Sequence, residues 1–351
     1  MRSTRYSIPD KAGTVNNPDS PYLIYSMLIP AEKVFELMNT LGKDRKPFLF
    51  GIDFDVKKGF FVEPAHAAAA GILFNLNGIG NDSPFVPGNE PVELIKHPIG
   101  FQTYKQAFGI VYDNLVQGNS YLVNLTFPTP IDLDKDLPEL FARSKARYRL
   151  LFRDEFVVFS PEKFVQIENG CIRSFPMKGT IDASIPDAEN LIINDYKETA
   201  EHNTIVDLIR NDLSMVATSV RVDRFRYIEK IPTNEKTLLQ VSSEISGKLT
   251  LNYLSELGSI FRKLLPAGSV SGAPKQKTLS IIQEAESYSR GFYTGVFGYF
   301  DGSKLDSGVM IRFIKKENGK LIFCSGGGIT INSKPETEYN ELTDKIYVPF
   351  I

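Results

Sequence analysis

Cysteine, histidine and excess charge are all scarce in this chain of 351 residues. Its two cysteines, Cys171 and Cys324, lie far apart without a C-x-x-C partner. We therefore expect two buried reduced thiols in a cytoplasmic enzyme, with a structural disulfide as the alternative. The three histidines, His66, His97 and His202, lack zinc-like spacing. The formal net charge of -2 provides no general positive field for nucleic acid or an anionic membrane.

Long apolar segments are also missing. The N-terminal stretch MRSTRYSIPDKAG has no apolar core and does not resemble a secretion signal. The longest apolar stretch, AHAAAAGILF, is far shorter than the roughly 20 residues that span a bilayer. A G-x-S-x-G nucleophile elbow is absent as well. The sequence therefore predicts a cytoplasmic protein without a membrane or nucleic-acid partner.

Strand and helix patterns alternate along the whole chain. β-rich runs include PFLFGIDFDV, SYLVNLTF, EFVVFS, SGVMIRFIKK and KLIFCSGGGITI. Turn dipeptides at 169–170, 301–302 and 318–319 predict antiparallel hairpins. Helical patterns include TYKQAFGIVYDNLVQG, AEHNTIVDLIRNDLSMVATSV and PETEYNELTDKIY, the last with Ser333 as a candidate N-cap and Pro335 in its first turn.

This mixture predicts an α+β fold. No Pro/Ser-rich linker, low-complexity tract or repeat divides the chain. We expect a single domain over residues 1–351, in which residues 1–90 form an N-terminal lobe that shares the core. Residues 91–351 then carry the motifs described below.

Two predicted helices each present acidic side chains on one face. Glu198 and Glu201 lie three residues apart, on the side where the apolar positions continue. Glu338, Glu341 and Lys345 form a similar stripe on the second helix. Two such glutamate pairs are suited to holding a divalent cation through hard oxygen ligands. The alternative is that each pair belongs to a solvated helix face.

Two features near the C-terminus are candidate anion-binding groups. Gly326, Gly327 and Gly328 end a predicted strand just before the second acidic helix. Their backbone N–H groups can approach an anionic ligand closely, although a plain bulge also explains them. Arg312 lies inside the apolar strand GVMIRFI and points either to the ligand or to solvent. The stretch PAGSVSGAPKQKT lacks the spacing of a nucleotide-binding phosphate loop.

Lys178 stands out because apolar residues surround it in the stretch SFPMKGTID. A lysine desolvated in an apolar corner has a lowered pKa, so its free amine is easier to form. A surface lysine in a hairpin is the alternative. The local sequence therefore raises the question of why a lysine lies in an apolar, backbone-constrained corner.

Six motifs in this order identify a family. SPEKF, PMKGT, KETAEHNTIVDLIRND, PAGSVSGAPK, RGFYTGVFGY and GGGIT-x₇-E-x₂-E-x₃-K together resemble the chorismate-utilising enzymes over roughly residues 100–350. The resemblance implies large mixed or antiparallel β-sheets packed face to face with helices outside. It also implies that the chain binds chorismate together with Mg²⁺.

The resemblance assigns roles residue by residue. Glu201 and Glu341 are similar to the direct Mg²⁺ ligands, and Glu198 and Glu338 to the acids around the metal. The expected cradle for the enolpyruvyl carboxylate resembles the family's in these residues: Tyr293, Arg312, Gly326, Gly327 and Gly328. Lys345 resembles a group near the metal site, and Ser269 resembles a small hydroxyl residue that reaches the substrate.

Within the family, the chain most resembles component I of aminodeoxychorismate synthase. Lys178 resembles the nucleophile that attacks C2 of chorismate, and Glu162 the general acid that protonates the departing C4 hydroxyl. Leu122 stands where isochorismate and salicylate synthases carry a lysine base, so hydration at C2 is not expected. Leu239 occupies the place of a histidine that is tied to pyruvate elimination in anthranilate synthases.

The resemblance implies amination of chorismate at C4, giving 4-amino-4-deoxychorismate for 4-aminobenzoate and folate synthesis. A separate glutamine amidotransferase subunit is expected to supply the ammonia. Two alternatives stay open. In the first alternative the chain is an anthranilate synthase component I in which Lys178 has no catalytic role. In the second it is a non-catalytic chorismate-binding subunit, which Leu122 and Leu239 suggest.

Overall fold

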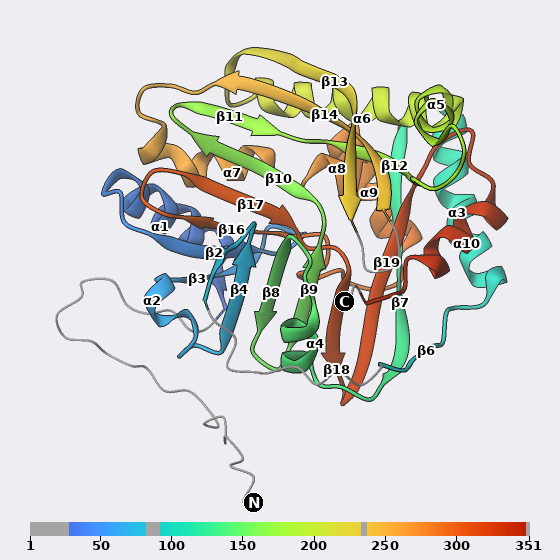
Figure 1. The fold of residues 1–351 in the computed structure, drawn as a ribbon, viewed down its shortest axis with the longest axis horizontal. Coiled ribbons are helices and arrows are strands. Elements are labelled where there is room, and N and C mark those ends of the chain that lie inside the picture. Colours follow the sequence, from blue (N-terminus) through green and yellow to red (C-terminus); the bar gives the residue numbers. More distant parts are fainter. Residues whose placement is uncertain (1–27, 82–91, 233–236, 349–351) are drawn as a thin grey trace, which may run out of the picture.

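The computed structural model of the chain describes residues 28–81, 92–232 and 237–348. Within these residues two large β-sheets face each other, and their strand pairs are antiparallel. Figure 1 shows helices on the outside of both sheets. The predicted α+β fold is therefore confirmed.

The first sheet carries the predicted nucleophile. Its strands run in the order β1, β3, β2, β16, β17, β10, β11, β14 and β12, with β13 also paired to β14. Their bounds are β1 Ile29–Pro30, β2 Phe48–Ile52, β3 Lys58–Val62, β10 Lys163–Glu168, β11 Cys171–Ser174, β12 Met177–Asp182, β13 Thr218–Pro232, β14 Thr237–Lys248, β16 Val296–Phe300 and β17 Leu305–Val309.

The second sheet carries the glycine run. Its order is β15, β7, β19, β18, β9, β8, β4 and β5, with β6 also paired to β7. Their bounds are β4 Ile72–Leu76, β5 Ile79–Gly80, β6 Leu94–Lys96, β7 Leu122–Leu133, β8 Tyr148–Phe152, β9 Phe156–Ser160, β15 Gly272–Ala273, β18 Phe313–Glu317 and β19 Lys320–Ile329.

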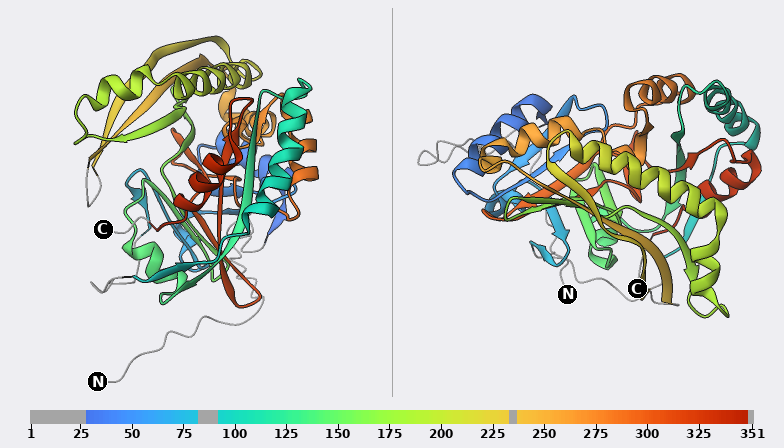
Figure 2. Two further views of the ribbon diagram at one scale, coloured as in Figure 1. Left: turned by 90° about the vertical axis from the view of Figure 1, so that its right-hand side faces the viewer. Right: turned by 90° about the horizontal axis from the view of Figure 1, so that it is seen from above.

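The helices cover the outer faces of the sheets, and α6 is the longest of those described. Figure 2 shows α6 lying along the top of the molecule, with α3 and α10 together at one end. Their bounds are α1 Ala31–Lys43, α2 Pro64–Ala67, α3 Phe101–Val116, α4 Leu137–Arg143, α5 Ala188–Asn194, α6 Tyr196–Ser214, α7 Leu257–Leu264, α8 Gly268–Ser271, α9 Lys275–Ala285 and α10 Pro335–Asp344, with a short 3-10 helix at Tyr253–Glu256.

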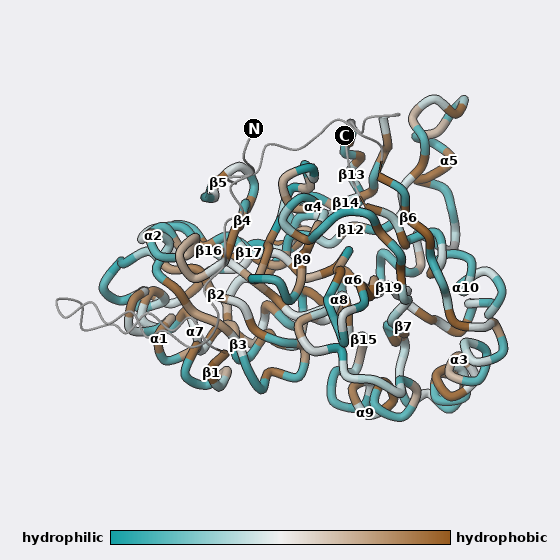
Figure 3. Tube along the Cα trace, turned by 90° about the horizontal axis from the view of Figure 1, so that it is seen from below, coloured by the Kyte–Doolittle hydropathy of each residue, from teal (hydrophilic) through white to brown (hydrophobic). Residues whose placement is uncertain are grey.

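Strand β2 shows how the core is divided between the sheets. Phe48 and Phe50 pack under α1 and α7, and the rings of Phe50 and Phe261 are 5.0 Å apart. Leu49 points the other way, into the cluster of side chains between the sheets. The run FLFGI is therefore apolar on both faces because each face is covered. Figure 3 shows the apolar stretches in brown along the central strands.

The hairpin predictions from turn dipeptides are confirmed. The dipeptides at 169–170, 301–302 and 318–319 connect β10 to β11, β16 to β17 and β18 to β19. Asn169, Gly170, Gly302, Asn318 and Gly319 all have positive φ angles. Asn and Gly adopt this backbone region more easily than other residues do, which is why such dipeptides mark tight turns.

Helix α6 begins at Tyr196, four residues before the predicted pattern, and ends at Ser214, because the end of that pattern belongs to β13. Asp195 is the N-cap, and its carboxylate accepts a hydrogen bond from the backbone N–H of Glu198 at 2.8 Å. In α10 the predicted cap is wrong, because Lys334 rather than Ser333 precedes the first helical residue. The Ser333 hydroxyl instead accepts a hydrogen bond from the N–H of Thr330, in the turn before the helix.

The described part of the N-terminal lobe contributes strands to both sheets, since β1 to β3 join the first and β4 and β5 join the second. The predicted bounds of the lobe and of the single domain stay predictions. In the part of the chain that the structure describes, no helix is long and apolar enough to cross a membrane.

The two cysteines are free thiols. Cys324 is buried as expected, whereas Cys171 is half-buried, because it sits at the start of β11 beside the hairpin turn. The disulfide alternative is therefore excluded for this structure.

Candidate active site

A pocket of about 770 Å³ lies where α6, α8, α10, β12 and β19 meet. Figure 1 shows β12, β19 and α10 converging on one side of the molecule. The structure brings most of the predicted site residues to this pocket, although they come from segments far apart in the sequence. Its lining includes Glu162, Lys178, Glu198, Glu201, Ser269, Tyr293, Arg312, Gly326, Gly327, Gly328, Glu341 and Lys345.

Lys178 projects from β12 into the pocket and forms an ion pair. Its Nζ lies 2.9 Å from Oε2 of Glu201, and 27% of its side chain is exposed. Burial lowers the pKa of Lys178, but the nearby carboxylates of Glu201, Glu341 and Glu198 outweigh it, so the pKa is raised overall. The predicted lowered pKa in an apolar corner is therefore wrong for this state of the site.

The reason for this correction lies outside the local sequence. Phe175, Pro176 and Met177 precede Lys178 in the chain, but side chains in a strand alternate between two faces. The face on which Lys178 points is closed by α6, whose first turns carry two glutamates. Neighbours in space rather than neighbours in sequence determine the protonation of this amine.

Glu162 lies immediately before β10 and is held by a hydroxyl group. The Oγ of Ser269 donates a hydrogen bond to Oε1 of Glu162 at 2.5 Å. Burial raises the pKa of Glu162, while the Ser269 hydrogen bond and the cations Lys178 and Lys345 lower it; the net shift is upward. A carboxyl group whose pKa is raised is better suited to general acid catalysis than an ordinary glutamate.

The two predicted acidic stripes face each other across the pocket. Burial and the neighbouring Glu201 raise the pKa of Glu198. A carbon atom built on Gly327 would lie 3.7 Å from Oε1 of Glu341 and 3.9 Å from Oε2 of Glu338. Glu338 itself is buried. The interpretation of these glutamates as solvated helix faces is therefore wrong for Glu201 and Glu338.

Lysine side chains neutralise part of this acidic group. Lys345, the C-cap residue of α10, has its Nζ 2.6 Å from Oε1 of Glu341 and 3.0 Å from the carbonyl oxygen of Gly326. Among the residues the structure describes, no group of three His, Cys, Asp or Glu side chains is arranged as a metal site. The carboxylate oxygens are nevertheless the donor type that Mg²⁺ prefers.

The glycine run lies on β19, paired with β7. Gly326 is opposite Thr126, and a carbon atom built on Gly326 would lie 2.4 Å from Cγ2 of Thr126. A carbon on Gly328 would lie 3.0 Å from Cδ1 of Leu122 and 3.6 Å from Nζ of Lys178. The strand is regular here, so the bulge interpretation is not needed; close packing and the open pocket account for the glycines.

Arg312 and Tyr293 complete one wall. Arg312 lines the pocket, so the alternative that it points to solvent is not supported. Its Nη1 donates to the carbonyl oxygen of Lys345 at 2.6 Å, and its guanidinium carbon lies 4.5 Å from the ring centre of Tyr347. Tyr293 is 3% exposed, and burial raises its pKa. The hydroxyl of Tyr293 and the guanidinium of Arg312 are both hydrogen-bond donors, which suits a carboxylate ligand.

The two leucines noted in the sequence occupy different places. Leu122 is buried and packs against Gly328. Leu239 is buried on β14 opposite Ile181 and does not line the pocket, whereas its neighbour Gln240 does.

Sequence reasoning missed Gln240 and Asp344 as lining residues. Asp344 follows Glu341 by three residues on α10, so the helical spacing that identified the other acids also contained this signal.

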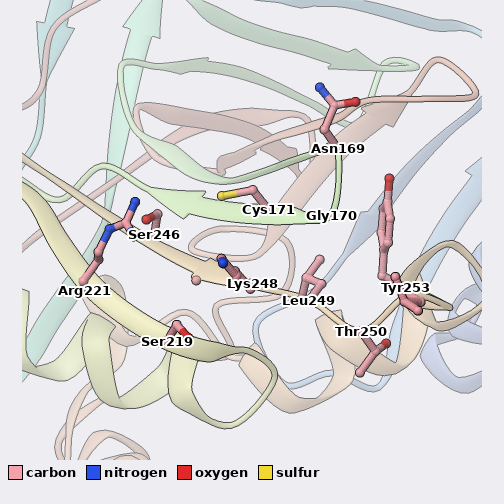
Figure 4. A pocket seen from close by; sticks show the side chains of 12 residues that line it. Asn169, Gly170, Cys171, Ser219, Arg221, Ser246, Lys248, Leu249, Thr250 and Tyr253 are labelled. Atoms are coloured by element: carbon pink, nitrogen blue, oxygen red, sulfur yellow. The ribbon is translucent and has the colours of Figure 1, made fainter.

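A second hollow of about 400 Å³ lies near the opposite end of α6. Figure 4 shows side chains from the turn at Asn169, from β13 at Arg221 and from the end of β14 around it. Arg221 is paired with Asp223 at 2.5 Å on the same strand. This hollow contains none of the predicted site residues.

The chain matches the family of chorismate binding enzymes over residues 63–350, and it belongs to that family. An uncharacterized PabA-like protein of Haemophilus influenzae is 50% identical over 314 residues, which are 90% of this chain and 95% of that protein. Aminodeoxychorismate synthase component 1 of Salmonella typhimurium is 31% identical over 69% of this chain and 56% of its own length. Anthranilate synthase component 1 of Pseudomonas aeruginosa is 32% identical over 76% of this chain.

Solved structures share the fold. The menaquinone-specific isochorismate synthase MenF of Escherichia coli has a TM-score of 0.70 and 16% identity, and it covers 91% of this chain and 82% of that one. Anthranilate synthase component I of Streptococcus pneumoniae has a TM-score of 0.61 and 25% identity over 74% of this chain and 60% of that one. Fold and family are thus defined, while three different reactions occur among the names.

Proposed function

We propose that this chain is component I of an aminodeoxychorismate synthase, which replaces the C4 hydroxyl of chorismate by an amino group. The observation that carries the proposal is the presence in one pocket of an amine and of a buried carboxyl group whose pKa burial raises. Lys178 supplies the amine and Glu162 the acid. Relatives with that name at about 31% identity support the assignment.

In the first step the Lys178 amine attacks C2 of chorismate. Both conjugated ring double bonds shift, the bond from C4 to its hydroxyl breaks, and Glu162 gives its proton so that water leaves. The attacking amine must be neutral, whereas the ion pair with Glu201, whose Oε2 lies 2.9 Å from Nζ, keeps Lys178 protonated. This ion pair would weaken when Glu201 holds a cation, so that the amine can lose its proton to water.

In the second step ammonia attacks C4 and both double bonds shift back. The bond between C2 and Lys178 breaks, and the lysine leaves as the amine. The product is 4-amino-4-deoxychorismate, which keeps its enolpyruvyl group. Leu122, which packs against Gly328, offers no group that activates water, which favours lysine over water as the nucleophile at C2.

Charge in the pocket supports a requirement for Mg²⁺. Five carboxylates and three cations line it, so the pocket carries an excess of two negative charges when all are ionised. Chorismate is itself a dianion, so a bound divalent cation would supply the missing charge compensation. Glu201 and Glu341 would hold the ion, with Glu198 and Glu338 beside them. Arg312, Tyr293 and the glycine backbone would then bind the enolpyruvyl carboxylate.

The ammonia would come from a glutamine amidotransferase subunit. Relatives are named component 1 of a synthase, which supports a second component, and other relatives are named PabA-like. The product would proceed through a separate lyase to 4-aminobenzoate and folate.

The test uses the pure protein with chorismate, Mg²⁺ and an ammonium salt at mildly alkaline pH, with and without aminodeoxychorismate lyase. We expect 4-aminobenzoate only when the lyase is present. Anthranilate without lyase would show amination at C2 and contradict the role of Lys178. If neither ammonia nor glutamine with a glutaminase subunit gives product, the chain only binds chorismate and the proposal fails.

A further inference from the structure

A buried ion pair lies directly behind the pocket and was not among the predicted site residues. Arg290 and Glu286 each expose 2% of their side chains. Nε of Arg290 donates to Oε2 of Glu286 at 2.8 Å, and Nη2 donates to Oε1 at 2.6 Å. Such a fork-to-fork pair fixes the orientation of the guanidinium plane.

The other N–H groups of Arg290 reach three separate segments. Nη2 donates to the carbonyl oxygen of Asn124 on β7 at 2.6 Å. Nη1 donates to the carbonyl oxygen of Val270 on α8 at 2.9 Å and to Oγ1 of Thr294 at 3.4 Å. All five guanidinium N–H groups are therefore used.

Each of these three partners belongs to the pocket wall. Asn124, Val270 and Thr294 line the pocket. They are also adjacent to groups of the proposed mechanism, because Asn124 is paired with Gly328 in the sheet, Val270 follows Ser269, and Thr294 follows Tyr293.

Glu286 extends the connection to the glycine strand. Its Oε1 accepts hydrogen bonds from both the backbone N–H and the hydroxyl of Thr126, each at 2.9 Å. Thr126 is the residue that packs against Gly326. The ring of Phe54, 4.4 Å from the guanidinium carbon, covers the arginine from another side.

We propose that the buried Glu286–Arg290 pair positions the chorismate-binding wall, and through Val270 and Ser269 the general acid Glu162. This inference rests on the proposed chemistry for the role of Glu162, but its binding part requires only that chorismate occupies the pocket. A buried ion pair adds little net stability compared with apolar side chains of similar size. The pair instead fixes the relative positions of the three wall segments at Asn124, Val270 and Thr294, which apolar side chains would not do.

The first test compares Arg290→Lys with a control of similar burial. Lysine keeps the charge but has three donors in place of a planar fork, so it loses at least two of the five bonds. The control is Tyr148→Phe, which removes a buried hydrogen bond of 3.0 Å to Asp306; neither Tyr148 nor Asp306 lines the pocket.

We measure three quantities for each variant: the melting temperature, the chorismate concentration that half-saturates chorismate consumption, and kcat for that consumption. Following chorismate itself keeps the test independent of which product forms. For a protein that binds without turnover, calorimetric binding of chorismate with Mg²⁺ replaces the rate measurement. A change of product therefore refutes the C4 proposal without affecting this one.

We expect Arg290→Lys to weaken chorismate binding at least about tenfold and to lower kcat, whereas Tyr148→Phe stays within about twofold of the parent protein at a similar loss of melting temperature. Equal binding and kcat in the two variants would overturn the proposal. If Arg290→Lys does not fold, the double variant Glu286→Gln with Arg290→Met removes both charges together. Normal chorismate binding by that folded double variant would overturn the proposal equally.

Discussion

The two ends of α6 hold charge in two different ways. At its N-terminal end Glu201 pairs with Lys178, which lies 23 residues earlier on a strand of the first sheet. Near its C-terminal end Arg221 pairs with Asp223 on the same strand, beside the hollow of Figure 4. The first pair exists only because the fold brings two distant segments together. The Arg221–Asp223 pair joins residues two positions apart on one strand, and exposed pairs of that kind contribute little to stability.

The difference is informative about function. Removing charges from water is costly, so a fold that gathers several carboxylates and amines in one cavity retains them for binding or chemistry. Predictions that compare equivalent changes at the two ends therefore test whether the N-terminal end is the active site.

The largest effect is expected from the two lysines. Lys178→Ala removes the proposed nucleophile and should lower kcat for ammonia-dependent amination at least about a thousandfold. Lys248→Ala, at the exposed hollow, should leave kcat within about twofold. Steady-state rates with chorismate, Mg²⁺ and ammonium salt measure both. If Lys178→Ala keeps more than a tenth of the parent rate, the lysine is not the nucleophile.

A second comparison concerns the acids. Glu201→Gln keeps the shape of a proposed metal ligand but removes its charge, so the Mg²⁺ concentration for half-maximal rate should rise about tenfold or more. Asp223→Asn is the matched change at the hollow and should leave the Mg²⁺ requirement unaltered. A Mg²⁺ titration of the rate at saturating chorismate distinguishes them. An unchanged requirement in Glu201→Gln would refute the ligand assignment.

The contrast also shows what sequence patterns can and cannot predict. The helical spacing of Glu198 and Glu201, and of Glu338 and Glu341, was sufficient to predict that each set shares one face. The NG and DG dipeptides were sufficient for three hairpins. These features depend on a few neighbouring residues, so local patterns contain them.

Features that depend on distant segments were not predictable in the same way. The flanking apolar residues of Lys178 indicated a lowered pKa, but the carboxylates of α6 raise it. The contacts of Arg290 with β7 and α8 join residues as far as 166 positions apart. No periodicity in the sequence connects such positions, although the family motifs contained the arginine.

A third prediction concerns pH. The proposed acid Glu162 is active when protonated, so kcat should fall as the pH rises through its raised pKa. The hydrogen bond from Ser269 holds that pKa lower than burial alone would, so Ser269→Ala should raise the pKa further and move the alkaline fall of kcat to higher pH. The rate at the optimum should also drop several-fold, because the acid loses its fixed orientation.

The measurement is kcat against pH at a constant concentration of free NH₃, so that titration of ammonium does not distort the profile. Ser246→Ala at the hollow is the control and should leave the profile in place. A shift of the Ser269→Ala profile to lower pH would contradict the hydrogen-bond argument.

The smallest contrast comes from two glycines. Gly328→Ala adds a methyl group 3.0 Å from Leu122 and 3.6 Å from the Lys178 amine, on the pocket side of an ordinary strand. We expect chorismate binding to weaken about fivefold, which corresponds to roughly 1 kcal/mol. Gly170→Ala meets only Cε1 of Tyr253, at an ordinary contact distance of 3.9 Å, but its φ of +70° is costly for a residue with a Cβ, by about 1–2 kcal/mol.

The two alanine variants should therefore separate binding from stability. Gly170→Ala should lower the free energy of unfolding in a denaturant titration and leave chorismate binding unchanged. Gly328→Ala should weaken chorismate binding and change the free energy of unfolding less than Gly170→Ala does. If Gly170→Ala weakened chorismate binding as much as Gly328→Ala does, the two ends of α6 would be coupled, and the pocket would not be the independent site that its charges define.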